Sequence, residues 1–321
     1  MKKVLFAMFA IAALAACSND ETISRSQDGA IKFDNVFVEK STRAADILTS
    51  SNTDLGLYGS VNKGDDYGKI FNNERVYHNG TAYTYDHTQY WVGNARYDFV
   101  AFAPYTGAQW AYTTTNDVKN GSLAFDNETA AANQDLLFTY ASRTTDDSVG
   151  TPQSVLLDCG HMLSRVKFTF TNGFADYNNI ELKVYDVTIT NAHADGTLAI
   201  TNGVAGDWVV GANTFEHNFG LVGDLAAATS GSTEHFYLIP TTATYNLTFK
   251  VDIKQAGVKL DTYARTATVD LNMVKGHSYN VKTTLDYENT SDEGALLPIE
   301  FSVTVSGWND SWSEVDAETT Y

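Results

Sequence analysis

The stretch IEFSVTVSGW, residues 299–308, shows the pattern that decides the fold. Its apolar side chains alternate strictly with polar ones, and they are Ile299, Phe301, Val303 and Val305. A period of two is typical of a β-strand with one buried face and one solvated face. Such a strand has two fates open to it. It either closes the sheet of its own domain or completes the sheet of another molecule.

The same alternation recurs along the chain at intervals of roughly ten residues, with Gly and Asn between the segments. Clear examples are residues 97–103, 163–170 and 245–253. Asn79–Gly80, between residues 75–77 and 81–85, predicts a β-hairpin. Aromatic residues make up 12% of the chain, and they fit pleated sheet surfaces better than helices. No segment after residue 16 keeps a helical period for three turns. We therefore predict an all-β protein of antiparallel β-sandwiches.

A chain of 321 residues has room for roughly two domains. A loop rich in Thr, Asp, Gly and Pro covers residues 142–154, and linkers of this composition often separate domains. We predict an N-terminal sandwich over 44–154 and a C-terminal sandwich over 155–295. Residues 296–321 then hold the closing strand and a polar tail.

The start of the chain resembles a bacterial lipoprotein signal. Residues 1–16 combine a basic start with a short apolar stretch, and Leu14–Ala15–Ala16–Cys17 resembles a lipobox. The resemblance implies cleavage before Cys17, acylation of its thiol with palmitate-type chains, and anchoring in the outer membrane. The alternative is an ordinary cleaved signal in which Cys17 is incidental. Cys159 is then left alone, without an internal disulfide, and we expect it to be buried as a small hydrophobe.

Residues 17–43 contain a polar tether and a first short strand, which is formed by Ile31, Phe33, Val36 and Val38. A polar loop follows, in which Arg43 precedes Ala44. Exposed loops of this kind are where proteolysis occurs. Arg25 is a rival site, but it precedes the first strand.

Composition and motifs argue against several other functions. Acidic residues outnumber basic ones 39 to 21, which disfavours nucleic acid as a partner. The seven His residues have no metal-ligand spacing, and no nucleophile or phosphate-binding motif is present, so we expect neither enzyme, metal nor cofactor. The acidic pairs 65–66 and 146–147 are better explained as solvated turns than as Ca²⁺ sites. Four aromatic residues could either stack on sugars or fill a sandwich core, and we favour the core: Tyr83, Tyr85, Tyr90 and Trp91.

Several segments then follow one another in the order of a known family. They are the lipobox, TRA (42–44), YDFVAFAP (97–104), DLLFTYAS (135–142), GHMLSRVKFTF (160–170), FYLIP (236–240), GHSYNVKTTL (276–285) and a last strand ending in Gly307–Trp308. In this order they resemble the fimbrillin family of the Bacteroidetes, the subunits of type V pili. The resemblance spans nearly the whole chain.

The resemblance implies two tandem transthyretin-like β-sandwiches, export as a lipoprotein, and cleavage between Arg43 and Ala44. The cut would remove the first strand and open a groove in the N-terminal sandwich. A strand of a neighbouring copy, or of a related pilus subunit, would fill it head to tail by β-augmentation. The donor residues are then Leu296, Leu297, Ile299, Phe301, Val303, Val305 and Trp308. The expected role is a fimbrial subunit that supports adhesion. The alternative is a lipid-anchored surface protein, or a tip or anchor subunit, that binds a glycan or host ligand without polymerising.

Overall fold

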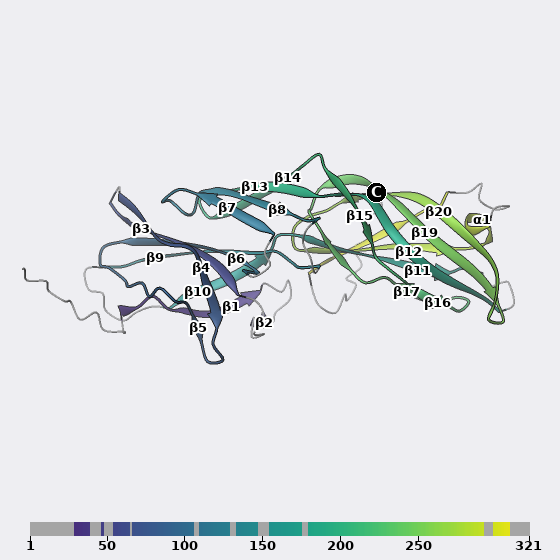
Figure 1. Cartoon of the computed structure of the whole chain (residues 1–321), viewed down its shortest axis with the longest axis horizontal. Coiled ribbons are helices and arrows are strands. Elements are labelled where there is room, and N and C mark those ends of the chain that lie inside the picture. Colours follow the sequence, from purple (N-terminus) through teal and green to yellow (C-terminus); the bar gives the residue numbers. More distant parts are fainter. Residues whose placement is uncertain are drawn as a thin grey trace, which may run out of the picture.

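The computed structural model describes residues 29–38, 46–47, 54–64, 66–105, 109–128, 133–146, 154–174, 179–291 and 298–308. Almost all regular structure in these ranges is β, as predicted. The exception is α1 (Tyr287–Thr290), a single turn capped by the side chain of Asp286. The molecule is elongated, with a group of strands at each end (Figure 1). Within the described ranges, no helix has the length and apolar character needed to cross a membrane.

An eight-stranded sheet at one end closes on itself. Its order is β10-β9-β6-β3-β4-β5-β1-β2, and β1 also pairs with β10. Closure through β1 protects backbone groups that would otherwise form a free sheet edge. The strands are β1 (Phe33–Val38), β2 (Asp46–Ile47), β3 (Leu55–Lys63), β4 (Asp66–His78), β5 (Tyr83–Thr84), β6 (Arg96–Ala103), β9 (Leu137–Thr144) and β10 (Val155–His161). The predicted hairpin is present, because β4 pairs with β5 across Asn79–Gly80.

A four-stranded sheet of order β14-β13-β8-β7 packs against the closed sheet. Its strands are β7 (Trp110–Thr114), β8 (Gly121–Asp126), β13 (Asp195–Thr201) and β14 (Val204–Val210). Strand β6 is buried on both faces as a result, since Phe99 belongs to one core and Phe102 to the other. The alternation predicted for residues 97–103 is therefore wrong, because all seven residues are buried. Burial on two faces explains why this stretch is apolar almost without a break.

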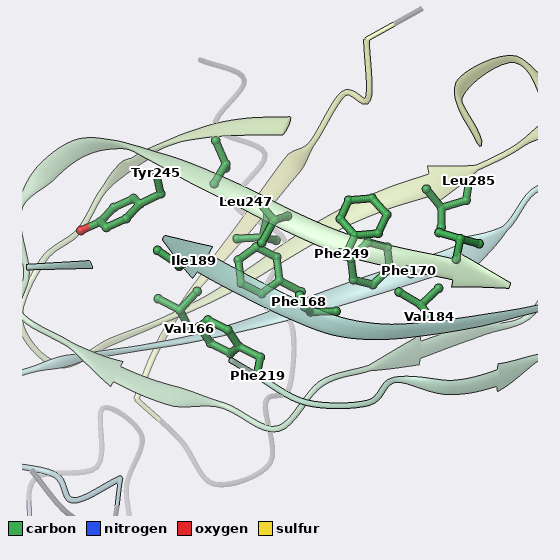
Figure 2. Close-up of a cluster of buried hydrophobic side chains, with 14 of the residues drawn as sticks. Val166, Phe168, Phe170, Val184, Ile189, Phe219, Tyr245, Leu247, Phe249 and Leu285 are labelled. Carbon is green, nitrogen blue, oxygen red and sulfur yellow. The ribbon is translucent and has the colours of Figure 1, made fainter. Parts of the chain in front are cut away.

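Two five-stranded sheets form the C-terminal sandwich. One contains β11 (Ser164–Asn172), β17 (Ser230–Ser232), β18 (Phe236–Leu238), β21 (His277–Leu285) and β22 (Ser302–Gly307). The other contains β12 (Ile180–His193), β15 (Thr214–Asn218), β16 (Gly223–Leu225), β19 (Thr242–Gln255) and β20 (Val258–Asn272). Phe168 and Phe170 of β11 meet Leu247 and Phe249 of β19 in the core between them (Figure 2). The inward apolar positions predicted for 163–170 and 245–253 are therefore confirmed, whereas Arg165, expected on the solvated face, is buried.

Strand pairing does not change at the boundary predicted between residues 154 and 155. Strand β10 pairs with β1 and β9 of the N-terminal sheet, so the change of sheet falls after His161. In addition, residues 195–200 of β13 pair with the whole of β8, and teal β13 lies beside blue β8 in Figure 1. The physical reason is that alternation fixes which face of a strand is buried, whereas the choice of neighbour depends on residues far away in the chain.

Candidate functional site: the first strand and its groove

Backbone hydrogen bonds hold the first strand on both of its sides. On one side, β1 runs parallel to residues 155–159 of β10. On the other, the amide of Ile31 donates to the carbonyl oxygen of Gln89 (2.8 Å), and the amide of Trp91 donates to that of Gly29 (3.0 Å). Loss of this strand would leave unpaired backbone groups on two neighbouring segments. A sheet in that condition is ready to accept a new strand.

The described side chains of the first strand are core residues. Ile31 and Phe33 are each 1% exposed. The Phe33 ring packs edge-on against Phe71, Tyr85 and Phe99, with centroid distances of 6.1, 5.7 and 5.7 Å. The Tyr85 hydroxyl donates to the carbonyl oxygen of Ile31 (2.7 Å). Burial raises the pKa of the Tyr85 phenol, so this donor stays protonated at neutral pH. Among the described side chains of the first strand, Phe33 therefore makes these aromatic contacts with the core and anchors the strand there.

Strand β10 supplies the wall of the groove, which consists of Val155, Leu157 and Cys159. All three are buried, with exposed fractions of 0%, 0% and 1%. The expectation that Cys159 is a buried small hydrophobe is confirmed. Burial raises the pKa of its thiol, so Cys159 is protonated and unreactive while β1 is in place.

A β-bulge interrupts the pairing of β1 with this wall. Asp34 lies opposite Leu156 and Val36 lies opposite Leu157, so Asn35 is an additional residue on β1. Such a residue has no partner in the ladder and disrupts it locally. The first strand therefore fits β10 less regularly than a strand with strict alternation would.

Five of the predicted site residues lie outside the described part of the chain: Cys17, Arg43, Ala44, Leu296 and Leu297. Lipidation and cleavage stay predictions for this reason. Val36 and Val38 are described as members of β1 by their backbone alone.

The closing strand lies in the C-terminal sheet of its own subunit. Strand β22 pairs antiparallel with β21, from Ser302 opposite Lys282 to Gly307 opposite His277. Among the strands that the structure describes, none pairs with its other side. Its predicted donor residues Ile299, Phe301, Val303 and Val305 are partly buried against the C-terminal core. The closing strand is thus an edge strand, and the donor role stays a prediction.

With Phe37 of the first strand left aside, the first and closing strands carry the same apolar residue types in the same order. The first strand has Ile31, Phe33, Val36 and Val38, and the closing strand has Ile299, Phe301, Val303 and Val305. This correspondence is visible in the sequence. Its significance is clear only once β10 is known as the partner strand. The three buried residues of β10 are also spaced by two, so they match the spacing of the closing strand.

The other kinds of site to consider among the described residues are metal sites and a sugar-binding platform. The described residues include no group of three or more His, Cys, Asp or Glu side chains that could hold a metal ion. Tyr83 and Trp91 are buried in the N-terminal core and Tyr85 packs against it, which confirms the core interpretation for these three over a sugar platform.

These features define an all-β architecture of stacked sheets, in which the first and last strands carry similar apolar residues. A family model described as fimbrillin-like matches residues 42–308. The chain belongs to this family, and the resemblance seen in the sequence is confirmed. Membership of a fimbrillin-like family supports a pilus-related structural role.

Solved structures share the fold at low sequence identity. A fimbrial protein from Bacteroides vulgatus is 14% identical with a TM-score of 0.63, and the match covers 87% of this chain and 99% of that one. A candidate cell adhesion protein from Bacteroides uniformis is 20% identical with a TM-score of 0.51, covering 88% and 100%. The fimbrial anchor protein Mfa2 from Porphyromonas gingivalis is 10% identical with a TM-score of 0.41, covering 87% and 97%. No curated protein matches the sequence.

Proposed function

We propose that this protein is a pilus subunit that polymerises by donating its closing strand to the groove of a neighbouring copy or related subunit. It is exported as a lipoprotein through Cys17, and cleavage between Arg43 and Ala44 removes β1 from the N-terminal sheet. The observation that carries the proposal is the match between the closing strand and the wall of the groove.

The match extends to individual residues. Placed parallel to β10, as β1 is, three alternating apolar residues of the donor lie opposite the three buried residues of β10. The pairs are Phe301 with Val155, Val303 with Leu157, and Val305 with Cys159. Ile299 then takes the position of Ile31. This alignment needs no additional residue, so the bulge at Asn35 is lost and the ladder becomes continuous.

Burial of the donor side chains in the groove would stabilise the contact between subunits. Four apolar side chains buried at about 1.5–3 kcal/mol each hold the donor firmly, before the cost of ordering the strand. A head-to-tail contact of this kind does not close on itself, so it generates a filament. The separate cores at the two ends of the molecule support two tandem transthyretin-like sandwiches as its architecture. Residues 296–321 then provide the donor segment and tail.

Treatment with an Arg-specific protease tests the proposal. Cleaved protein should form ladders that resist unheated detergent, and the variant Arg43→Ala should stay monomeric under the same treatment. Arg25→Ala serves as the matched control. It keeps Arg43, and the cut that it prevents would leave β1 in place, so this variant should still polymerise. A chain that is cut at Arg43, loses its first strand and remains a monomer would contradict polymerisation.

The pairing of β22 with β21 supports a second candidate. A subunit that keeps its closing strand would act as a lipid-anchored surface protein, or as a tip or anchor subunit, that binds a glycan or host ligand. Deletion after Asp292 separates the candidates. A folded monomer unable to polymerise supports donation, whereas an unfolded C-terminal sandwich shows that β22 is an obligatory core strand. Val303→Asp should likewise block donation in a folded chain.

A further inference from the structure

The closing strand is anchored mainly at its end. Trp308 is the only residue of the described segment 298–308 that is buried, with 6% of its surface exposed. The rest of this segment is half-buried or exposed. Because a tryptophan buries more area than any other side chain, Trp308 contributes a large share of the contact that holds the segment.

Trp308 occupies an aromatic slot. Its ring stacks on His161 with a centroid distance of 4.1 Å and an interplanar angle of 14°, and on Tyr237 at 5.3 Å and 3°. The guanidinium carbon of Arg165 lies 4.9 Å from the ring centroid, within the range of a cation–π contact. The Trp308 amide donates to the carbonyl oxygen of Gly276 (3.0 Å). The side chain is therefore held by both stacking and charge.

The slot joins the two ends of the molecule. His161 is the last residue of β10 in the N-terminal sheet, whereas Arg165 and Tyr237 belong to β11 and β18 of the C-terminal sandwich. Polar partners fix these walls. His161 Nδ1 is hydrogen-bonded to the carboxylate of Asp135, and Arg165 Nε donates to Ser278 Oγ (2.6 Å). Neither bond involves Trp308, so His161 and Arg165 keep these partners when the indole leaves the slot.

We propose that Trp308 is a latch: it keeps β22 in its own subunit, and withdrawal of the indole from the slot is the step that frees the strand for exchange. The proposal deepens the donor role described above and rests on it. The rest of β22 is paired with β21 alone and its side chains are only half-buried. It can therefore dissociate from the edge of the sheet once Trp308 has left the slot. A latch makes donor release, and not only groove opening, a controlled step of assembly.

Hydrogen exchange in the uncleaved full-length chain tests the latch without any need for polymer. In Trp308→Ala, the amides of residues 299–307 should exchange about 10²-fold faster than in the wild type, because the variant loses a buried tryptophan. The β12–β19 ladder should keep its protection. Trp308→Phe, which keeps a ring in the slot, should give a smaller increase. Trp312→Ala is the matched control for the substitution and should change nothing.

Two results would overturn the latch. One is an unchanged exchange rate over 299–307 in Trp308→Ala. The other is an equal gain of exchange across both sandwiches in Trp308→Phe, which would show a general structural role. After cleavage at Arg43, the Trp308→Ala subunit should also polymerise faster than the wild type, because its closing strand leaves β21 more readily. If residues 299–307 open faster and neither protein polymerises, the latch stands and the donor-strand function fails.

Discussion

Replacement of Phe33 by alanine should open the N-terminal groove without any cleavage. Phe33 is buried and makes edge-to-face contacts with three rings, so its truncation removes both area and aromatic pairing. Core Phe→Ala substitutions cost about 3–5 kcal/mol. Since β1 is attached to the sheet only through its pairing and its side chains, this loss falls on the local opening of β1. It corresponds to an increase of about 10²- to 5 × 10³-fold in the open population.

The thiol of Cys159 reports this opening directly. It lies in the wall covered by β1, opposite Val38 in the ladder. In a Cys17→Ser background it is the one remaining thiol, so the rate of its reaction with a thiol reagent in native buffer measures the open state. Lys32→Ala is the control, because that exposed side chain lies beside Phe33 in sequence and points away from the core. Equal labelling rates in Phe33→Ala and in the control would refute the reasoning that Phe33 anchors β1.

Three further predictions address the bulge, a titrating side chain and a tight turn. Deletion of Asn35 should remove the bulge and slow the release of the cleaved N-terminal fragment about fivefold, as one restored hydrogen bond would; faster release would contradict the proposed register. Burial lowers the pKa of His217 from 6.5 to about 4, so its contribution to stability is complete above pH 6.5 and is lost as the pH falls towards 4. The loss is about 1–2 kcal/mol after solvent screening, and urea unfolding across this pH range should show a shallower dependence in His217→Gln. Gly203→Ala should lower thermal stability by about 1–3 kcal/mol more than Gly64→Ala, because both glycines have positive φ but only at Gly203 would a Cβ collide, 2.3 Å from the Tyr140 ring; equal effects would show that backbone strain alone decides the cost.

The fold class could be predicted because each strand carries its own signal. Strict alternation in residues 163–170 and 245–253 marks strands that face one core, and both are found as β11 and β19. The nearly unbroken apolar run of β6 carried a further signal, burial on two faces, which points to a third layer. That layer, the sheet built from β7, β8, β13 and β14, was not foreseen.

The neighbours of each strand could not be predicted, because pairing is not a local property. Val155, Leu157 and Cys159 form a clear alternating strand, but nothing nearby in sequence shows that it runs parallel to β1. The same holds for Trp308, whose slot draws on His161 and Tyr237, both distant in the chain. Motif order could identify the family, whereas the geometry of the groove and the slot depended on tertiary structure.

In the donor-strand exchange proposed above, cleavage would act as the trigger. While β1 is covalently attached, its local concentration at the groove is in the millimolar range or above, and no donor from another molecule competes well. A cut at Arg43 makes β1 a separate chain that dilutes once it dissociates. The closing strand would offer one Ile, one Phe and two Val side chains without the bulge at Asn35, and it stays attached to a folded subunit. The direction of assembly is then set by loss of the tether and by the better register of the donor, with no need for the donor to be more hydrophobic than the strand it replaces.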